Sequence, residues 1–433
     1  MTSKLILCWP RSSLKPKGIG RLMNDVARHA VWLYEERIGW LFHHDNYTWF
    51  EFIEEYLSDS ARPVLGLRFE EQPRAKFAAN LRLPQWFSNV LPEGIMREWI
   101  ALERAVSPER EMELIAQVGH DLPGAVRVLP SDYETFPEDF STVDAASIAE
   151  DPIIGGHQPW KFSLAGVGLK FSMVRDGARF TCTATGEGGD WILKLPDSRF
   201  GAVPLNEYTM MRFAGAVGID VPDVEMVHRD QVVGLPPHVW PSDEQYAYAV
   251  RRFDRDESRR LVHIEDFAQV RGFYPVQKYE GNFETIASLA YRGRDTESLF
   301  EFVRRLVFFI LIGNGDAHLK NWSLIYRDRR IPTLSPAYDI MSTEPYNVGD
   351  GPEDLGLKFA GSTRFDAVRV AYFDRLAQKL RCDHDLAGVA LDVIDRVRER
   401  WPEYSDALAD APRVRNSIHA AIEKRAVTLG NRI

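Results

Sequence analysis

The chain has 433 residues, more than one hydrophobic core usually fills, so its length predicts two or three lobes. Apolar residues make up 45% and charged residues 27%, which is the composition of an ordinary globular protein. The formal net charge of -10 disfavours non-specific nucleic-acid binding, because phosphate neutralisation supplies most of that affinity. Three scattered cysteines exclude a disulfide framework and a zinc site. With no signal peptide and no membrane-spanning stretch predicted, we expect a soluble cytoplasmic protein with no membrane partner.

Residues 1–150 are predicted to form an N-terminal subdomain for packing or docking, because they contain no catalytic spacing of side chains. Apolar runs predict strands at 4–8 and 64–69, and a helix at 109–118. Residues 132–158 are rich in Asp, Glu, Pro and Gly, which indicates a linker or a surface excursion.

Residues 151–255 are predicted to form a β-rich nucleotide-binding lobe. The pair Asp176-Gly177 is a strong hairpin-turn signal. Apolar residues at i, i+3, i+4 and i+7 predict a helix over residues 206–217. The expected strands cover residues 161–174, 178–185, 191–195, 223–227 and 246–253.

Residues 256–433 are predicted to form a mostly helical lobe. The apolar spacing over residues 299–306 predicts a buried helix that stops at Gly313. A polar loop follows, and further strands are expected at 322–326 and 334–341. The chain as a whole is therefore predicted to have an α+β fold.

A basic cluster in the sequence follows the last strand of the β-rich lobe. Its members are Arg251, Arg252, Arg255, Arg259 and Arg260. A local nucleic-acid patch is one interpretation. We expect a solvated loop instead, because charge runs usually lie on a hydrated surface.

Residues 313–321 carry the most informative spacing. A buried helix runs into a loop with Asp316 and, five residues later, Asn321, and Asp339 follows at the end of the next expected strand. Phosphoryl transfer needs a carboxylate to receive the proton of the attacking hydroxyl, and oxygen ligands for Mg²⁺. We interpret Asp316 as the catalytic base, and Asn321 and Asp339 as metal ligands. Alternatively, Asp316 and Asn321 are only turn residues, but the flanking helix, strand and later Asp339 favour a kinase.

Two further candidates lie inside this loop. Lys320 is a candidate catalytic residue, because its charge could neutralise the moving phosphoryl group. His318 is a candidate nucleotide-site residue that orients the backbone around Asp316. A purely structural role is the alternative for both, and we favour it for His318.

A Gly-rich segment is predicted to cover the phosphates, because small residues let backbone N–H groups approach phosphate oxygens. It is not a Walker A loop, since no GKS or GKT follows and it leads into a hairpin. An ordinary Gly-rich turn is the alternative. The candidate nucleotide-binding residues of this segment are Ser163, Ala165, Gly166, Val167, Gly168 and Lys170.

Lys194 lies on the expected strand after the hairpin, where protein kinases place a lysine that contacts the α/β-phosphates. An inward-facing lysine between leucines is costly unless it is paired. Glu207 on the following helix is the candidate partner, and an outward, solvated Lys194 is the alternative. The nucleotide-binding candidates Arg252, Phe253 and Asp254 close the lobe, where a hinge to the adenine ring is expected.

Taken in chain order, these residues resemble the HipA family of bacterial serine/threonine kinase toxins. The resemblance implies a two-lobed protein-kinase-like fold with an extra N-terminal subdomain and a mostly helical C-lobe. It implies ATP and Mg²⁺ as cofactors and a protein Ser or Thr as acceptor. The matching segments are NVLPE (89–93), VGHDLPGAV (118–126), SLAGVGLK (163–170), ILKLP (192–196), NEY (206–208), RFDR (252–255), HIEDFAQ (263–269), KYE (278–280), GNGDAHLKN (313–321) and PAYDIMS (336–342).

The resemblance also implies a regulatory setting. In the family, the serine equivalent to Ser163 is autophosphorylated, which ejects the loop and silences the kinase. The implied substrate is an aminoacyl-tRNA synthetase, notably the glutamyl enzyme, whose modification stalls translation. The implied partner is a HipB-like helix-turn-helix antitoxin, so this chain would meet DNA only indirectly. The family commonly has Gln where this chain has Gly168, which leaves a more flexible loop.

Two other functions compete with a toxin kinase. A small-molecule kinase of the aminoglycoside phosphotransferase kind shares a D-x-H-x-x-N loop, matched here by Asp316, His318 and Asn321. The N-terminal block and residues 263–269 speak against it. A non-catalytic member that only binds nucleotide or a partner is disfavoured, because all three catalytic residues are present.

Overall fold

The computed structural model describes residues 26–131, 170–182, 188–235, 239–347 and 351–431. The expected strand at 4–8, the expected linker at 132–158 and the candidates Ser163, Ala165, Gly166, Val167 and Gly168 lie outside the described residues. Within the described parts of the chain, each helix is too short or too polar to cross a lipid bilayer.

The N-terminal domain is built on an antiparallel five-stranded sheet with the strand order β4-β3-β2-β1-β5. Its strands are β1 Ala27–Leu33, β2 Glu36–His44, β3 Tyr47–Phe52, β4 Phe77–Asn80 and β5 Val126–Pro130. Its helices are α1 Glu54–Ser58, α2 Leu67–Glu71, α3 Gln85–Ser88, α4 Gly94–Glu103 and α5 Glu111–Val118. The expected helix at 109–118 is therefore confirmed as α5.

The expected strand at 64–69 is wrong, because residues 67–71 form helix α2. Phe69 is the buried residue of this short helix, and its ring packs against the rings of Phe50 and Phe77 in the N-terminal sheet. A short apolar run fits both helical and strand periods, so tertiary packing decides between them.

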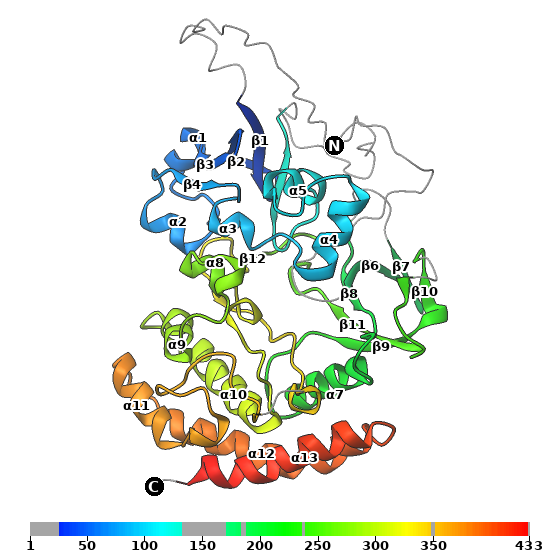
Figure 1. The fold of residues 1–433 in the computed structure, drawn as a ribbon. Coiled ribbons are helices and arrows are strands. Elements are labelled where there is room, and N and C mark those ends of the chain that lie inside the picture. The colour runs from blue at the N-terminus through cyan, green and yellow to red at the C-terminus, as the bar shows by residue number, and fades with distance from the viewer. Residues whose placement is uncertain (1–25, 132–169, 183–187, 236–238, 348–350, 432–433) are drawn as a thin grey trace, which may run out of the picture.

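The β-rich lobe is a six-stranded sheet with the order β10-β7-β6-β8-β11-β9. Its strands are β6 Lys170–Asp176, β7 Arg179–Cys182, β8 Trp191–Lys194, β9 Val224–His228, β10 Val232–Val233 and β11 Tyr246–Arg251. Helix α7, Val203–Ala216, packs on β9 and β11 (Figure 1). The expected strands at 191–195, 223–227 and 246–253 and the expected helix at 206–217 are confirmed, with ends shifted by a few residues.

The helical lobe is centred on α10, Thr296–Ile312, which packs against α9, α12 and α13. Asp295 caps its start by accepting a hydrogen bond from Ser298 N at 3.0 Å. Gly313 ends it in the left-handed conformation with φ 73°, as expected from the sequence. The other helices are α8 Phe267–Arg271, α9 Phe283–Tyr291, α11 Ala371–Leu380, α12 Leu386–Asp406 and α13 Pro412–Gly430.

A small three-stranded sheet lies between the helical lobe and the N-terminal domain. Its strands, in the order β12-β13-β14, are β12 His263–Asp266, β13 Ser323–Tyr326 and β14 Thr333–Leu334. The strand expected at 334–341 is thus limited to β14. Asp339 lies in the following loop with a left-handed φ of 54°, and not at the end of a strand.

Two large hydrophobic cores join these units. One core continues from the N-terminal domain into the six-stranded sheet, and the other joins α7 to the helical lobe. Figure 1 shows the N-terminal domain above, the six-stranded sheet at the side and α12 and α13 at the base.

Candidate active site

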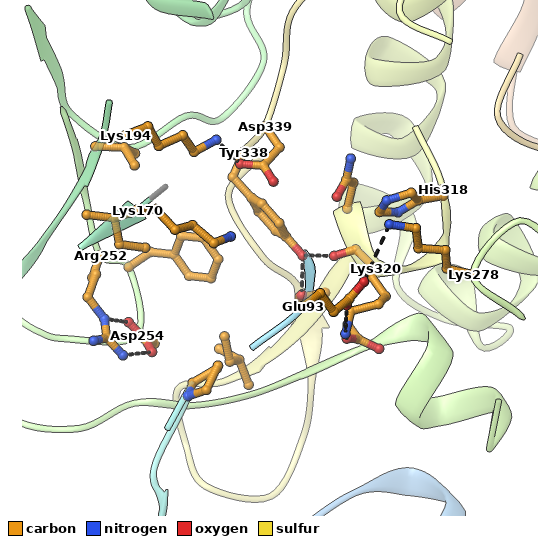
Figure 2. Close-up of a pocket in the computed structure, with 18 of the residues that line it drawn as sticks. Glu93, Lys170, Lys194, Arg252, Asp254, Lys278, His318, Lys320, Tyr338 and Asp339 are labelled. Atoms are coloured by element: carbon orange, nitrogen blue, oxygen red, sulfur yellow. Dashed lines mark hydrogen bonds and ion pairs between the residues drawn. The ribbon is translucent and has the colours of Figure 1, made fainter. Parts of the chain in front are cut away.

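One cavity collects side chains from all three parts of the molecule (Figure 2). The N-terminal domain contributes Glu93 and Pro123. The β-rich lobe and the segment after it contribute Lys170, Ile192, Lys194, Val250, Arg251, Arg252, Phe253 and Asp254. The helical lobe and the three-stranded sheet contribute Ile264, Asp266, Gln269, Lys278, Asp316, His318, Lys320, Asn321, Ser323, Tyr338 and Asp339.

The loop after α10 is held by its own backbone and by Asn321. His318 N donates to Asp316 O at 2.8 Å, and Asn321 N donates to His318 O at 2.9 Å. Asn321 Nδ2 also donates to Asp316 O at 2.8 Å. Asn321 therefore both lines the cavity and fixes the turn that carries the Asp316 carboxylate.

Asp316 is about half exposed, and its Oδ1 accepts a hydrogen bond from Tyr279 Oη at 2.5 Å. Burial and the neighbouring Asp316 carboxylate raise the pKa of Tyr279, so the phenol keeps its proton and donates it to this bond. Tyr279 was not among the predicted site residues, although the KYE segment that contains it was recognised as a family match.

Lys194 forms a partly buried bridge between two carboxylates. Its Nζ lies 2.5 Å from Glu207 Oε1 and also donates to Asp339 Oδ1. The expected Lys194–Glu207 pair is confirmed, and Asp339 is its second partner. Burial alone would raise the pKa of Asp339, but Lys194 and Lys170 outweigh it and lower the pKa to about 2. Asp339 is therefore ionised at neutral pH.

Lys170 lies directly opposite Lys194 on the neighbouring strand β6. Burial and the Lys194 charge lower the pKa of the Lys170 ammonium. Like charges placed opposite each other destabilise a sheet. A polyanion bound between the two lysines would relieve that repulsion, so this end of the cavity is suited to a triphosphate.

The other end of the cavity is largely apolar. Ile192, Val250 and Ile264 line it together with Pro123 of the N-terminal domain. The Phe253 ring lies 5.5 Å from the Tyr338 ring. Apolar lining of this kind can bury a flat ring system of a ligand.

Arg252 and Asp254 are buried and bind each other. Arg252 donates to both Asp254 oxygens at 2.9 and 2.8 Å and to Asp121 Oδ1 at 3.2 Å, and Arg255 donates to Asp121 at 3.0 Å. The expectation of a solvated loop is therefore wrong for Arg252 and Arg255, although Arg259 is exposed. Their counter-charge comes from Asp121, which lies far away in sequence, so local charge patterning could not indicate the burial.

His318 and Lys320 point in different directions from the same loop (Figure 2). His318 is buried, and burial lowers its pKa to about 4, so the ring is neutral at pH 7. Its ring meets the Tyr279 ring edge-on at 5.1 Å. Lys320 Nζ donates to Asn89 O at 2.8 Å and lies 2.7 Å from Glu93 Oε1. Sequence reasoning missed these two partners of Lys320.

A cleft between a β-rich lobe with a lysine–carboxylate bridge and a helical lobe with an Asp-bearing loop defines a two-lobed, kinase-like fold. Residues 29–129 match the family model of the HipA N-terminal domain, and residues 162–402 match that of the HipA-like C-terminal domain. The chain belongs to the HipA family, as the sequence motifs indicated.

The chain is also similar to individual proteins. It is 42% identical over 406 residues to the Sinorhizobium fredii protein named "Putative kinase Y4dM". The aligned residues cover 92% of this chain and 96% of that relative. It is 27% identical to the serine/threonine-protein kinase toxin HipA of Shewanella oneidensis, over 61% of this chain and 64% of the relative. The HipA chain in a Shewanella oneidensis HipA, HipB and operator DNA complex matches with a TM-score of 0.71 and 20% identity, covering 93% and 97%. That likeness confirms the fold.

Proposed function

We propose that this protein is a serine/threonine protein kinase that transfers the γ-phosphate of ATP to a protein hydroxyl. The observation that carries the proposal is that Asp316, Asn321, Lys194 and Asp339 line one cavity. Those side chains come from three separate segments, the strand with Lys194, the loop with Asp316 and Asn321, and the loop with Asp339. They are the groups that a kinase needs around a bound nucleotide.

The cavity supports a division of roles. Ile192, Val250 and Phe253 would hold the adenine ring, and Lys170 and Lys194 would neutralise the phosphates. The acceptor hydroxyl would bind at Asp316 and give its proton to that carboxylate as its oxygen attacks the γ-phosphorus and ADP leaves.

The residues present fit a magnesium ion. Mg²⁺ prefers oxygen ligands, and it is usually held by one or two carboxylates together with substrate phosphates. Asp339, which is ionised, and the Asn321 amide oxygen line the same cavity and would hold it. When bound, the ion would neutralise charge on the phosphates and orient them.

The regulatory setting is part of the proposal. The Shewanella oneidensis HipA chain that shares this fold is in complex with HipB and its operator DNA, which supports a HipB-like antitoxin as partner, with DNA contact through that partner. The family membership supports a toxin that arrests growth by phosphorylating an aminoacyl-tRNA synthetase in the cytoplasm. It also supports autophosphorylation at Ser163.

The test compares the unaltered protein with Asp316→Asn after incubation with labelled ATP, Mg²⁺ and a cell lysate. A catalytic base contributes roughly 10² to 10⁴-fold to the rate, so Asp316→Asn should lose transfer to protein while still binding ATP. Asp374→Asn, on the exposed surface of α11, is the matched control and should keep full activity. Mapping the phosphosites by mass spectrometry would identify the target and test Ser163. Full transfer by Asp316→Asn would refute the proposal.

A further inference from the structure

The catalytic loop is attached to the N-terminal domain through one buried lysine. Lys320 lies next to Asn321 and four residues after Asp316 and lines the same cavity, and its ammonium contacts Asn89 and Glu93 of the N-terminal domain. Only 6% of the side chain is exposed. Its ammonium donates to the Asn89 carbonyl at 2.8 Å and lies 2.7 Å from the Glu93 carboxylate.

The same two residues reach a second segment that supports the loop. Glu93 lies 3.6 Å from the Lys278 ammonium, and Asn89 Nδ2 donates to Phe273 O at 2.7 Å. The Lys278 carbonyl in turn accepts a hydrogen bond from Leu319 N, in the catalytic loop, at 3.0 Å. Asn89 and Glu93 therefore hold the catalytic loop directly through Lys320 and indirectly through residues 273–278.

This arrangement changes what Lys320 can do. A buried ammonium is stable only when its charge is paired and its donors are bonded. Here Glu93 supplies the pairing, and Asp266 Oδ2 lies 3.9 Å away as a second carboxylate. A lysine committed to these partners is poorly placed to follow a moving phosphoryl group. It is well placed to fix the backbone between Asp316 and Asn321.

We propose that Asn89 and Glu93 are positioning residues for the catalytic loop, so that the N-terminal domain is a working part of the phosphoryl-transfer site. This inference rests on the kinase function proposed above. It assigns a role to the NVLPE segment, which was recognised from the sequence as a family match without a function of its own. It also predicts that a partner or ligand that shifts the N-terminal domain would change the transfer rate.

The test uses the full chain with four changes. Glu93→Gln keeps the size of the side chain and removes its charge. Lys320→Met removes the paired cation, and the double variant removes both charges together. Trp86→Phe is the matched control, because Trp86 lies on α3 near Asn89 and its indole bonds to Glu265 across the same interface, at a distance from the catalytic loop in sequence and outside the residues that line the cavity.

The first readout separates turnover from nucleotide binding. Glu93→Gln should lower kcat for protein phosphorylation about 10 to 100-fold, while KM for ATP changes less than about threefold, because the loop and not the nucleotide site is displaced. The double variant should be faster than Lys320→Met alone, because in Lys320→Met the buried Glu93 charge loses its nearer cation and keeps only Lys278 at 3.6 Å. Trp86→Phe should lower the thermal midpoint but keep kcat at low temperature.

Two results would overturn the inference. In the first result, Glu93→Gln keeps full kcat, whereas Lys320→Met loses kcat completely and the double variant does not recover it. That result would mean that Lys320 acts on the phosphoryl group itself. The other is an equal loss of kcat in Glu93→Gln and Trp86→Phe, which would reduce the effect to general destabilisation.

A second readout needs no turnover and so separates this inference from the kinase proposal. Hydrogen exchange measured by mass spectrometry should show faster exchange over residues 314–322 in Glu93→Gln than in Trp86→Phe. That result supports positioning even if the unaltered protein transfers no phosphate. Unchanged exchange in this loop would refute positioning whatever the activity.

Discussion

Replacing Lys194 with methionine should lower both the free energy of unfolding of the protein and its rate of phosphoryl transfer. Lys194 is the cation shared by Glu207, which is 4% exposed, and by Asp339. Breaking a buried ion pair by removing one partner costs roughly 3 to 5 kcal/mol, because a carboxylate is left without its counter-charge. Losing one preorganised cation from a phosphoryl site costs on the order of 10² to 10³ in kcat.

Asp339 determines how the stability of this variant changes with pH on the acid side. The pKa of Asp339 falls from its usual 3.8 to about 2, because Lys194 outweighs the effect of burial. A carboxyl whose folded pKa lies below its unfolded pKa stabilises the fold above the unfolded value, and this contribution is lost as the pH falls through the folded value. The difference in the free energy of unfolding between the unaltered protein and Lys194→Met should therefore become smaller as the pH falls from about 4 to about 2.

Urea unfolding across this pH range and transfer of labelled phosphate at pH 7.5 would measure the two effects separately. The double variant Lys194→Met with Glu207→Gln is the control, because it removes one of the stranded carboxylates. It should recover part of the lost stability and none of the lost activity. If Lys194→Met transfers phosphate within about fivefold of the unaltered rate, Lys194 does not hold the phosphates and the reasoning fails.

Two further substitutions, at Glu265 and at Gly313, test the structure that supports the site. Burial raises the pKa of Glu265 from 4.5 to about 7, so its stabilising effect is complete below about pH 4.5 and is lost as the pH rises through 7. Relative to Glu265→Gln, the unaltered protein should lose roughly 3 kcal/mol of unfolding free energy between pH 5 and pH 8, and a constant difference in urea titrations would contradict this. Gly313→Ala places a Cβ 2.5 Å from Glu344 Oε2 at φ 73°, whereas Gly293→Ala at φ 72° meets nothing within 4 Å. Gly313→Ala should lower the thermal midpoint more than Gly293→Ala, whose cost is about 1 kcal/mol of backbone strain, and equal midpoints would refute the steric argument.

Local chemistry made much of the frame predictable from sequence. Helix α10 and its end at Gly313 follow from apolar spacing and from the need for a left-handed residue at the helix end. Strand β8 and the Lys194–Glu207 pair follow because a lysine between two leucines needs a partner and one carboxylate lies on the next helix. In each case the decisive neighbour lies within about fifteen residues.

The features that sequence did not predict depend on contacts between distant segments. Lys320 meets Asn89 across 231 positions, and Arg252 meets Asp121 across 131. Nothing local distinguishes such a residue from a solvated lysine or arginine. The helix at residues 67–71 is a further case. The short apolar run fits both a helix and a strand, and the packing of Phe69 in the N-terminal core favours the helix.

These long-range pairs also determine which cations of the cleft are available to a ligand. Glu93 pairs with Lys320, Asp254 pairs with Arg252, and Asp223 lies 3.5 Å from Arg251. Within the described part of the chain, Lys170 is the cavity-lining cation for which no carboxylate lies within 4 Å. It lies opposite Lys194, whose own charge is shared between two carboxylates. A bound anion would therefore gain most from Lys170, because that partly buried charge lies opposite a like charge and has the most repulsion to lose.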